Sequence, residues 1–206
     1  MLGVILCGGQ STRMGSDKGL LKASLPPKGG NMLAHEALTW AQTAVDKIAE
    51  LQLLVVLSVN AKQYTGYSAI FSQHQLITDN DSLQMKGPLC GLLSVHIQYP
   101  DEDLFILACD MPLMETNLLK ELLSGYRHQI SPDVFIYTHD GEPEPLCGIY
   151  KAKGLAHIYS LYQSRQLPKH SMKYMLEHIA THSIPLPDDK KKCFRNFNAH
   201  AELNGL

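Results

Sequence analysis

The sequence predicts an α/β fold of three layers, in which a mostly parallel, twisted sheet carries helices on both faces. Apolar runs of strand length alternate along the chain with segments whose apolar residues recur at helical spacing. The strand runs are almost continuously apolar, which is typical of strands that are buried on both faces of a sheet. This alternation favours repeated strand–helix–strand units and hence a parallel sheet.

The first half of the chain supplies three of the expected strands. Residues 1–7 read MLGVILC, a buried strand, and apolar residues at helical spacing over 33–48 predict an amphipathic helix. The run at 51–60 predicts a second strand and the short run at 75–78 a third, and residues 88–99 have the pattern of a helix. These elements give the order expected of strand–helix–strand units.

The second half continues the alternation. The run DLFILACD at 103–110 predicts a strand, and Leu118, Leu119 and Leu122 mark the helix after it. The remaining expectations are strands at 133–139 and 144–150, helices at 152–164 and 170–180, and a solvated loop DDKKK at 188–192.

Length and composition indicate one domain, spanning residues 1–206. The 206 residues suffice for a sizeable core, and 45% hydrophobic with 18% charged residues is typical of a globular protein in solution. A formal net charge of -2 argues against a nucleic-acid partner, and the longest apolar runs are too short to span a membrane. No signal-peptide pattern opens the chain, and its five cysteines are scattered. A cytoplasmic location is therefore expected.

The loop after the first strand is the first candidate site. Residues 6–18 read LCGGQSTRMGSDK, which fits neither of the two common phosphate-loop patterns. Gly8 and Gly9 allow a sharp turn with backbone N–H groups facing a ligand, while Arg13 and Lys18 add positive charge. The combination suits a triphosphate. The alternative is a tight turn with two surface cations.

A carboxylate at a second strand end is the next candidate. Asp110 follows the run LFILAC, and Pro112 stops strand pairing just beyond it. Ligands of open α/β sheets bind at the carboxyl ends of the strands, and a lone carboxylate there suits Mg²⁺ bound to substrate phosphates. The alternative is an aspartate that caps a helix or a turn.

Other polar residues lie beside predicted strand ends. Asn60 could read a base edge or cap a turn, and Asp79 with Asp81 forms an Asp-x-Asp that could hold a metal or arise by chance in a loop. Asn196 and Asn198 could complete a metal or ligand shell or start the last helix. The ten histidines show no metal-ligand spacing, and no Gly-x-Ser-x-Gly is present.

Taken together, these stretches resemble the molybdenum cofactor guanylyltransferases, the MobA family of nucleotidyltransferases. The resemblance covers nearly the whole chain in the family's order: LCGGQSTRMGSDKGLL, VNA at 59–61, ITD before GPLCGLLS, ILACDMP, EPLCGIY and FRNFNAHAEL. It implies a Rossmann-like nucleotidyltransferase fold. One departure is Cys7, which stands where the family usually has alanine and which is harmless if contact is made through the backbone.

The resemblance implies a role for each candidate. The residues implied to bind GTP are Leu6, Cys7 and Gly8 through their backbone, Gly9 at the turn, Gly15 and Arg13 in the phosphate loop, Lys18 at the triphosphate, and Asn60, Asp79 and Asp110. Arg13, Lys18 and Asp110 are the implied catalytic residues, with Asp110 the ligand of Mg²⁺. Asn196 and Asn198 would lie near the pterin. The N-terminal half would thus bind mainly nucleotide, and the C-terminal half mainly the acceptor.

The implied reaction transfers GMP from GTP to molybdopterin, giving molybdopterin guanine dinucleotide and pyrophosphate. The resemblance also implies transient contacts with proteins that deliver molybdopterin and with apo-molybdoenzymes. Four alternatives stay open: a molybdopterin cytidylyltransferase, a sugar-phosphate nucleotidyltransferase, a glycosyltransferase using Asp79 and Asp81, and a non-catalytic nucleotide-binding chaperone.

Overall fold

The computed structural model describes residues 1–8, 17–22 and 38–195. Its strands form a single seven-stranded sheet in the order β3-β2-β1-β4-β6-β5-β7. The strands are β1 (Leu2–Leu6), β2 (Leu54–Val59), β3 (Leu76–Thr78), β4 (Leu104–Ala108), β5 (Val134–His139), β6 (Glu142–Tyr150) and β7 (Thr181–Pro185). Only β6 runs antiparallel to its sheet neighbours. The predicted mostly parallel sheet is confirmed.

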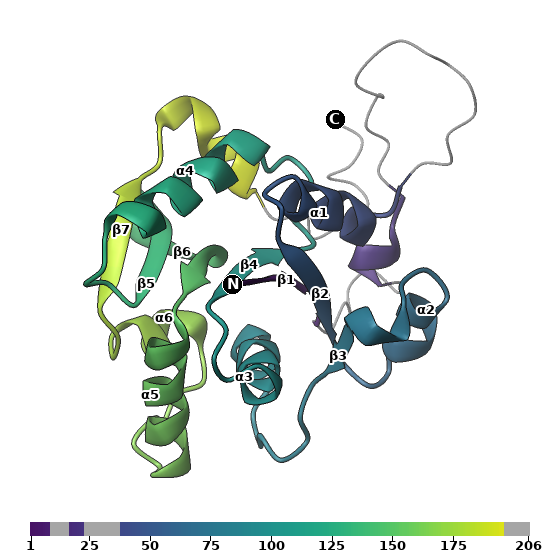
Figure 1. The fold of residues 1–206 in the computed structure, drawn as a ribbon, viewed down its shortest axis with the longest axis horizontal. Coiled ribbons are helices and arrows are strands. Elements are labelled where there is room, and N and C mark those ends of the chain that lie inside the picture. The colour runs from purple at the N-terminus through teal and green to yellow at the C-terminus, as the bar shows by residue number, and fades with distance from the viewer. Residues whose placement is uncertain (9–16, 23–37, 196–206) are drawn as a thin grey trace.

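Helices cover both faces of this sheet (Figure 1). One face carries α1 (Trp40–Ala49) and α4 (Thr116–His128), and the other carries α3 (Pro88–Gln98), α5 (Ala152–Gln163) and α6 (Met172–Leu176). Successive residues of a strand face opposite layers, so Ile5 packs into the core under α1 and α4 while Val4 packs into the core under α3 and α5. The three-layer prediction is confirmed.

Two predicted helices are shorter than expected. The helix predicted from residue 33 begins at Trp40, because Thr39 is its N-cap and forms a capping box with Gln42; residues 33–37 lie outside the described ranges. The helix predicted over 170–180 is reduced to α6, whose C-cap is Glu177, and the carbonyl of Ala180 accepts hydrogen bonds from the N–H groups of Asp133 and Val134 at the start of β5. The capping box fixes the start of α1, and by Ala180 the chain has joined the hydrogen bonds of the sheet.

Five short elements were not expected from the sequence. The loop predicted over DDKKK is wrong: residues Asp188–Phe194 form a 3-10 helix, η3, whose last residues Cys193 and Phe194 are buried. Strand β7 is a partly exposed edge strand, and α2 (Tyr64–Ser68) is a five-residue helix after β2. Two more short 3-10 helices are η1 (Lys18–Leu20), which follows β1, and η2 (Gln73–Gln75), which precedes β3.

The topology places the candidate site residues at one edge of the sheet. Strands β1, β2, β3 and β4 are all parallel, so their carboxyl ends lie together. The residues that follow these ends are Cys7, Asn60, Asp79 and Cys109–Asp110. Across the described ranges, none of the helices is both long and apolar enough to cross a membrane.

Candidate active site

Lys18 and Asp110 meet at the carboxyl edge of the sheet. Lys18 is the first residue of η1 and Asp110 follows β4, the neighbour of β1 in the sheet. The Lys18 Nζ lies 3.3 Å from the Asp110 Oδ2, although 92 positions separate the two residues along the chain. Their side chains are only 18% and 21% exposed, so water screens the pair less than a surface ion pair. The structure therefore brings these two predicted site residues together.

Asp17, which the sequence did not single out, anchors the segment that carries Lys18. As N-cap of η1, its Oδ1 accepts hydrogen bonds from the Gly19 N–H and from the Tyr67 hydroxyl, both at 3.0 Å. Its Oδ2 accepts a hydrogen bond from the Gln63 Nε2 at 2.6 Å. An aspartate before a short turn is a common N-cap signal, but nothing local in the sequence indicates Gln63 and Tyr67 as its partners.

The packing of η1 leaves no room for a side chain at Gly19. A Cβ placed there would overlap the Tyr67 hydroxyl and lie 3.3 Å from the Cys109 Sγ. Tyr67 is fully buried, and burial, with Cys7, Cys109 and Asp17 nearby, raises the pKa of its hydroxyl well above the ordinary value. Tyr67 therefore stays protonated and remains a hydrogen-bond donor to Asp17.

Asp79 presents a buried, unpaired carboxylate oxygen beside the end of β1. Its backbone N–H donates to the Val59 carbonyl, and its Oδ1 has no hydrogen-bond partner among the described residues. A Cβ added at Gly8 would lie 3.7 Å from its Oδ2, and one added at Gly91 3.5 Å from its Oδ1. Burial, and secondarily Asp81, raises the pKa of Asp79 to about 6. An unpaired acceptor of this kind favours a ligand that donates hydrogen bonds.

Asn60 and the end of β1 are engaged in local hydrogen bonds. The Asn60 Oδ1 accepts from the N–H groups of Lys62 and Gln63, so this side chain caps the turn after β2. The Cys7 N–H donates to a β2 carbonyl, and the Cys7 carbonyl accepts from the Gln63 Nε2 at 2.9 Å. Of the two interpretations of Asn60, the structure displays the cap, while its role toward a nucleotide stays a prediction.

Five predicted site residues lie outside the described ranges: Gly9, Arg13, Gly15, Asn196 and Asn198. Among the described residues, no group of three or more His, Cys, Asp or Glu side chains is arranged to hold a metal ion. Mg²⁺ typically takes one or two protein carboxylates together with substrate phosphates. The single carboxylate of Asp110, beside the cation of Lys18, fits that donor set.

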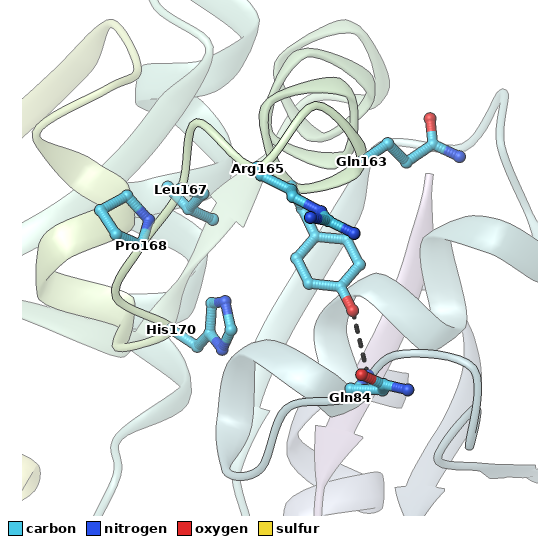
Figure 2. A pocket seen from close by; sticks show the side chains of 7 residues that line it. Gln84, Gln163, Arg165, Leu167, Pro168 and His170 are labelled. Atoms are coloured by element: carbon cyan, nitrogen blue, oxygen red, sulfur yellow. Dashed lines mark hydrogen bonds between the residues drawn. The ribbon is translucent and has the colours of Figure 1, made fainter.

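A pocket of about 400 Å³ lies between α5 and the loop that joins β3 to α3 (Figure 2). The Tyr162 hydroxyl accepts a hydrogen bond from the Gln84 N–H at 3.0 Å, and the Tyr162 ring meets the His170 ring edge-on, with centroids 5.6 Å apart. The lining is Gln84, Tyr162, Gln163, Arg165, Leu167, Pro168 and His170. Gln84 is the lining residue that comes from the β3–α3 loop, which begins at Asp79, and the other lining residues come from the end of α5 and the segment after it.

Residues 3–181 match the model of the MobA-like NTP transferase domain. The chain belongs to this family. The nucleotidyltransferase class, which the resemblance to the MobA family implied, is confirmed, and the chain is an enzyme of that class.

Individual relatives of this MobA-like chain match over almost its full length. It is 30% identical over 202 residues to a probable molybdenum cofactor guanylyltransferase of Flavobacterium johnsoniae, covering 98% of this chain and 94% of that protein. It is 28% identical over 208 residues to the protein of the same name from a Geobacillus species, covering 100% and 97%. The structure of a molybdopterin-guanine dinucleotide biosynthesis protein A from Archaeoglobus fulgidus superposes with a TM-score of 0.75 at 19% identity, covering 100% and 96%. That structure supports the fold.

Proposed function

We propose that this MobA-like chain transfers GMP from GTP to molybdopterin. A terminal phosphate oxygen of molybdopterin attacks the α-phosphorus of GTP and forms a new P–O bond. The bond between the α-phosphorus and the oxygen that bridges to the β-phosphorus breaks, and pyrophosphate leaves with that electron pair. The products are molybdopterin guanine dinucleotide and pyrophosphate. The acceptor phosphate is already ionised near neutral pH, so no residue is needed as a strong base.

The observation that carries the proposal is the meeting of Lys18 and Asp110 at the carboxyl edge of the sheet. Both substrates are anions, and at about 4 Å with an effective dielectric constant near 20, each pair of unit charges interacts by about 4 kcal/mol. Lys18 would bind the triphosphate, with Arg13 and Gly15 in the same loop, and so offset part of this repulsion. A protein that only stored a nucleotide would not need a carboxylate beside the phosphates.

Asp110 is the proposed ligand of Mg²⁺. Asp110 would hold the ion, which would supply positive charge to offset the negative charge of the phosphates during transfer. Lys18 lies 3.3 Å from the same carboxylate and holds Asp110 in a fixed orientation at the strand end. The phosphates would replace part of this ion pair, so that Lys18 turns toward the ligand when GTP arrives.

The unpaired Asp79 supports guanine as the base. Guanine offers two donors on one edge, its ring N1–H and its exocyclic amine, which match the two oxygens of a carboxylate. Gly8 leaves the Asp79 carboxylate open to such an edge, because a side chain at this position would approach it. Leu6, Cys7 and Gly9 would form the backbone wall of the base site, with Asn60 holding the turn next to it. Cytosine offers a single exocyclic amine and would leave one acceptor unpaired.

The pocket beside α5 supports an acceptor site in the C-terminal half. Arg165 and His170 line it together with the Tyr162 ring, and this set suits an anionic ligand that carries a planar ring system (Figure 2). Asn196 and Asn198 remain proposed contacts to the pterin. In this proposal one domain binds the nucleotide at the ends of β1–β3 and the acceptor beside α5.

The test is transfer with a panel of nucleotides. Purified protein is incubated with Mo-molybdopterin and Mg²⁺ together with GTP, CTP or ATP in turn, and pyrophosphate release is measured. Pyrophosphate release with GTP, but not with CTP or ATP, supports the proposal. A preference for CTP would assign a cytidylyltransferase. Sugar phosphates and nucleotide sugars in place of molybdopterin test the sugar-phosphate nucleotidyltransferase and the glycosyltransferase. GTP binding without any pyrophosphate release would favour a nucleotide-binding chaperone.

A further inference from the structure

One amide side chain links three segments at the edge of the sheet. The Gln63 Nε2 donates to the Cys7 carbonyl at the end of β1 and to the Asp17 carboxylate that caps η1. The Gln63 Oε1 accepts from the Asn60 N–H, in the turn that follows β2. The distances are 2.9, 2.6 and 3.0 Å. Every donor and acceptor of this amide is therefore engaged, except the second acceptor site of its oxygen.

We propose that Gln63 is a positioning residue, which fixes Lys18 relative to the end of β1 by holding the Asp17 carboxylate. The inference rests on the proposed function, in which the end of β1 binds the base and Lys18 binds the triphosphate. Gln63 touches neither the base-facing Asp79 nor the Lys18–Asp110 pair in any hydrogen bond of the described structure. It acts through Asp17, whose backbone continues directly into Lys18.

The chemistry of the contact explains why an amide is required. Two acceptor oxygens, one of them a carboxylate, converge on one NH₂ group, and only a side chain with two donors satisfies both. A glutamate at this position would bring a second carboxylate to within hydrogen-bonding distance of Asp17. A methionine would keep the length and volume of the side chain but would leave the Asp17 Oδ2 and the Cys7 carbonyl without this donor.

Tyr67 provides an independent anchor for the same carboxylate. Its hydroxyl donates to the Asp17 Oδ1 at 3.0 Å from a fully buried ring. The two donors approach different oxygens of Asp17, so together they restrict both the position and the rotation of the carboxylate. Loss of Gln63 then leaves Asp17 held on one side only, which frees Lys18 without removing the core contacts of Tyr67.

The test measures how much of the binding affinity comes from the phosphates. GTP and GMP are titrated by calorimetry, each with Mg²⁺, into the full-length wild type and into the variants Gln63→Met, Lys18→Met and the double variant. We expect Gln63→Met to weaken GTP binding about tenfold and GMP binding less than about threefold, since a lost hydrogen bond to a charged group changes affinity by this order. We expect the double variant to bind GTP no more weakly than Lys18→Met alone, because the two residues act as a unit.

Gln75→Met is the matched control. Gln75 also stands three residues after a cap residue, and its Oε1 accepts from the backbone N–H of Ser72, but it has no link to Asp17. This variant is expected to bind both nucleotides as the wild type does. A merely structural role of Gln63 would lower GTP and GMP affinity equally, and additive losses in the double variant would likewise overturn the positioning role.

Two further readouts keep the proposal falsifiable. If Gln63→Met does not fold, as judged by circular dichroism, Tyr67→Phe is used instead, because it removes one donor to Asp17 and keeps the ring. Tyr67→Phe is expected to lower the affinity for GTP about threefold and to leave the affinity for GMP unchanged. Equal binding of both nucleotides by Tyr67→Phe and by the wild type would then overturn the proposal. If the wild type binds GTP no better than GMP, the proposed function fails and the positioning role with it. If the wild type binds GTP more tightly than GMP, but Gln63→Met loses affinity for both nucleotides equally, only the positioning role is overturned.

Discussion

Replacing Asp79 with asparagine should stabilise the fold and weaken GTP binding at the same time. The Asp79 Oδ1 is buried and has no hydrogen-bond partner in the described part of the chain, and burial raises the pKa of this carboxyl to about 6 from an ordinary 3.8. Asparagine has nearly the same shape and no charge to desolvate. The substitution therefore removes a cost of folding that the wild type accepts at its proposed base site.

The magnitude follows from the raised pKa. Two pKa units correspond to roughly 3 kcal/mol, because each unit is worth about 1.4 kcal/mol. Asp79 remains partly exposed, and solvent screening reduces the effect to about 1–2 kcal/mol. The folded protein binds the proton more tightly than the unfolded chain, so wild-type stability falls as pH rises from about 4 to about 6 and the deficit is complete above that window. Asp79→Asn should thus be more stable at pH 7.5, by roughly 3–6 °C in Tm, and equally stable at pH 4.

The assay combines unfolding with nucleotide binding. Urea unfolding at pH 7.5 and pH 4.0 gives the stability difference, and calorimetry gives the affinity for GTP and for inosine triphosphate, which lacks the exocyclic amine. The wild type should prefer GTP about tenfold, and Asp79→Asn should lose that preference. Wild-type affinity for GTP should also fall below pH 6, as Asp79 takes up a proton.

Asp81→Asn is the control, because Asp81 is the exposed partner of the same Asp-x-Asp. It should keep the preference for GTP. A destabilised Asp79→Asn, or one that still distinguishes GTP from inosine triphosphate, would refute the assignment of Asp79 to the base. Loss of activity in Asp81→Asn that exceeds the loss in Asp110→Ala would instead favour the glycosyltransferase alternative.

Three further substitutions test other parts of the site. Asp110→Ala should lower Mg²⁺-dependent pyrophosphate release roughly 10³-fold, as loss of one charge contact implies; an unchanged rate with a normal circular dichroism spectrum would contradict the metal assignment. Gly19→Ala should destabilise the fold by about 1–3 kcal/mol in urea unfolding, because its Cβ would overlap the Tyr67 hydroxyl. Arg165→Ala should raise the KM for molybdopterin about tenfold and leave the affinity for GTP unchanged; a change in GTP affinity alone would place Arg165 on the nucleotide side.

The central strands could be predicted because their sequences carry the signal of burial on both faces. Strand β4 has five buried residues in a row, and such a run has few alternatives to a central parallel strand. Strand β7 has no such signal, since it lies at the edge and reads THSIP with no fully buried residue. The start of α1 was placed too early because the apolar spacing was followed back beyond its cap, Thr39.

Some residues of the candidate site could likewise be predicted from the sequence, and others could not. Lys18 and Asp110 were predicted to share a site because each follows a strand, and the carboxyl ends of parallel strands converge. Asp17 and Gln63 were missed because their contact depends on how the turn after β2 folds back over the end of β1, across 46 positions of the chain. General rules of topology predict which strand ends converge, whereas the choice of hydrogen-bond partner depends on three-dimensional packing.

These contacts explain how a loop without a standard phosphate pattern can still hold a lysine in place. In the familiar phosphate loops the lysine begins a long helix, which fixes its backbone through many hydrogen bonds. Lys18 begins a 3-10 helix of only three residues, which is too short to provide such rigidity. Its position must then come from side chains on other elements: the partners of Asp17, the tight contact of Gly19 with Tyr67, and the pairing with Asp110. Substitutions at these supporting residues should therefore affect triphosphate binding more strongly than their distance from the phosphates suggests.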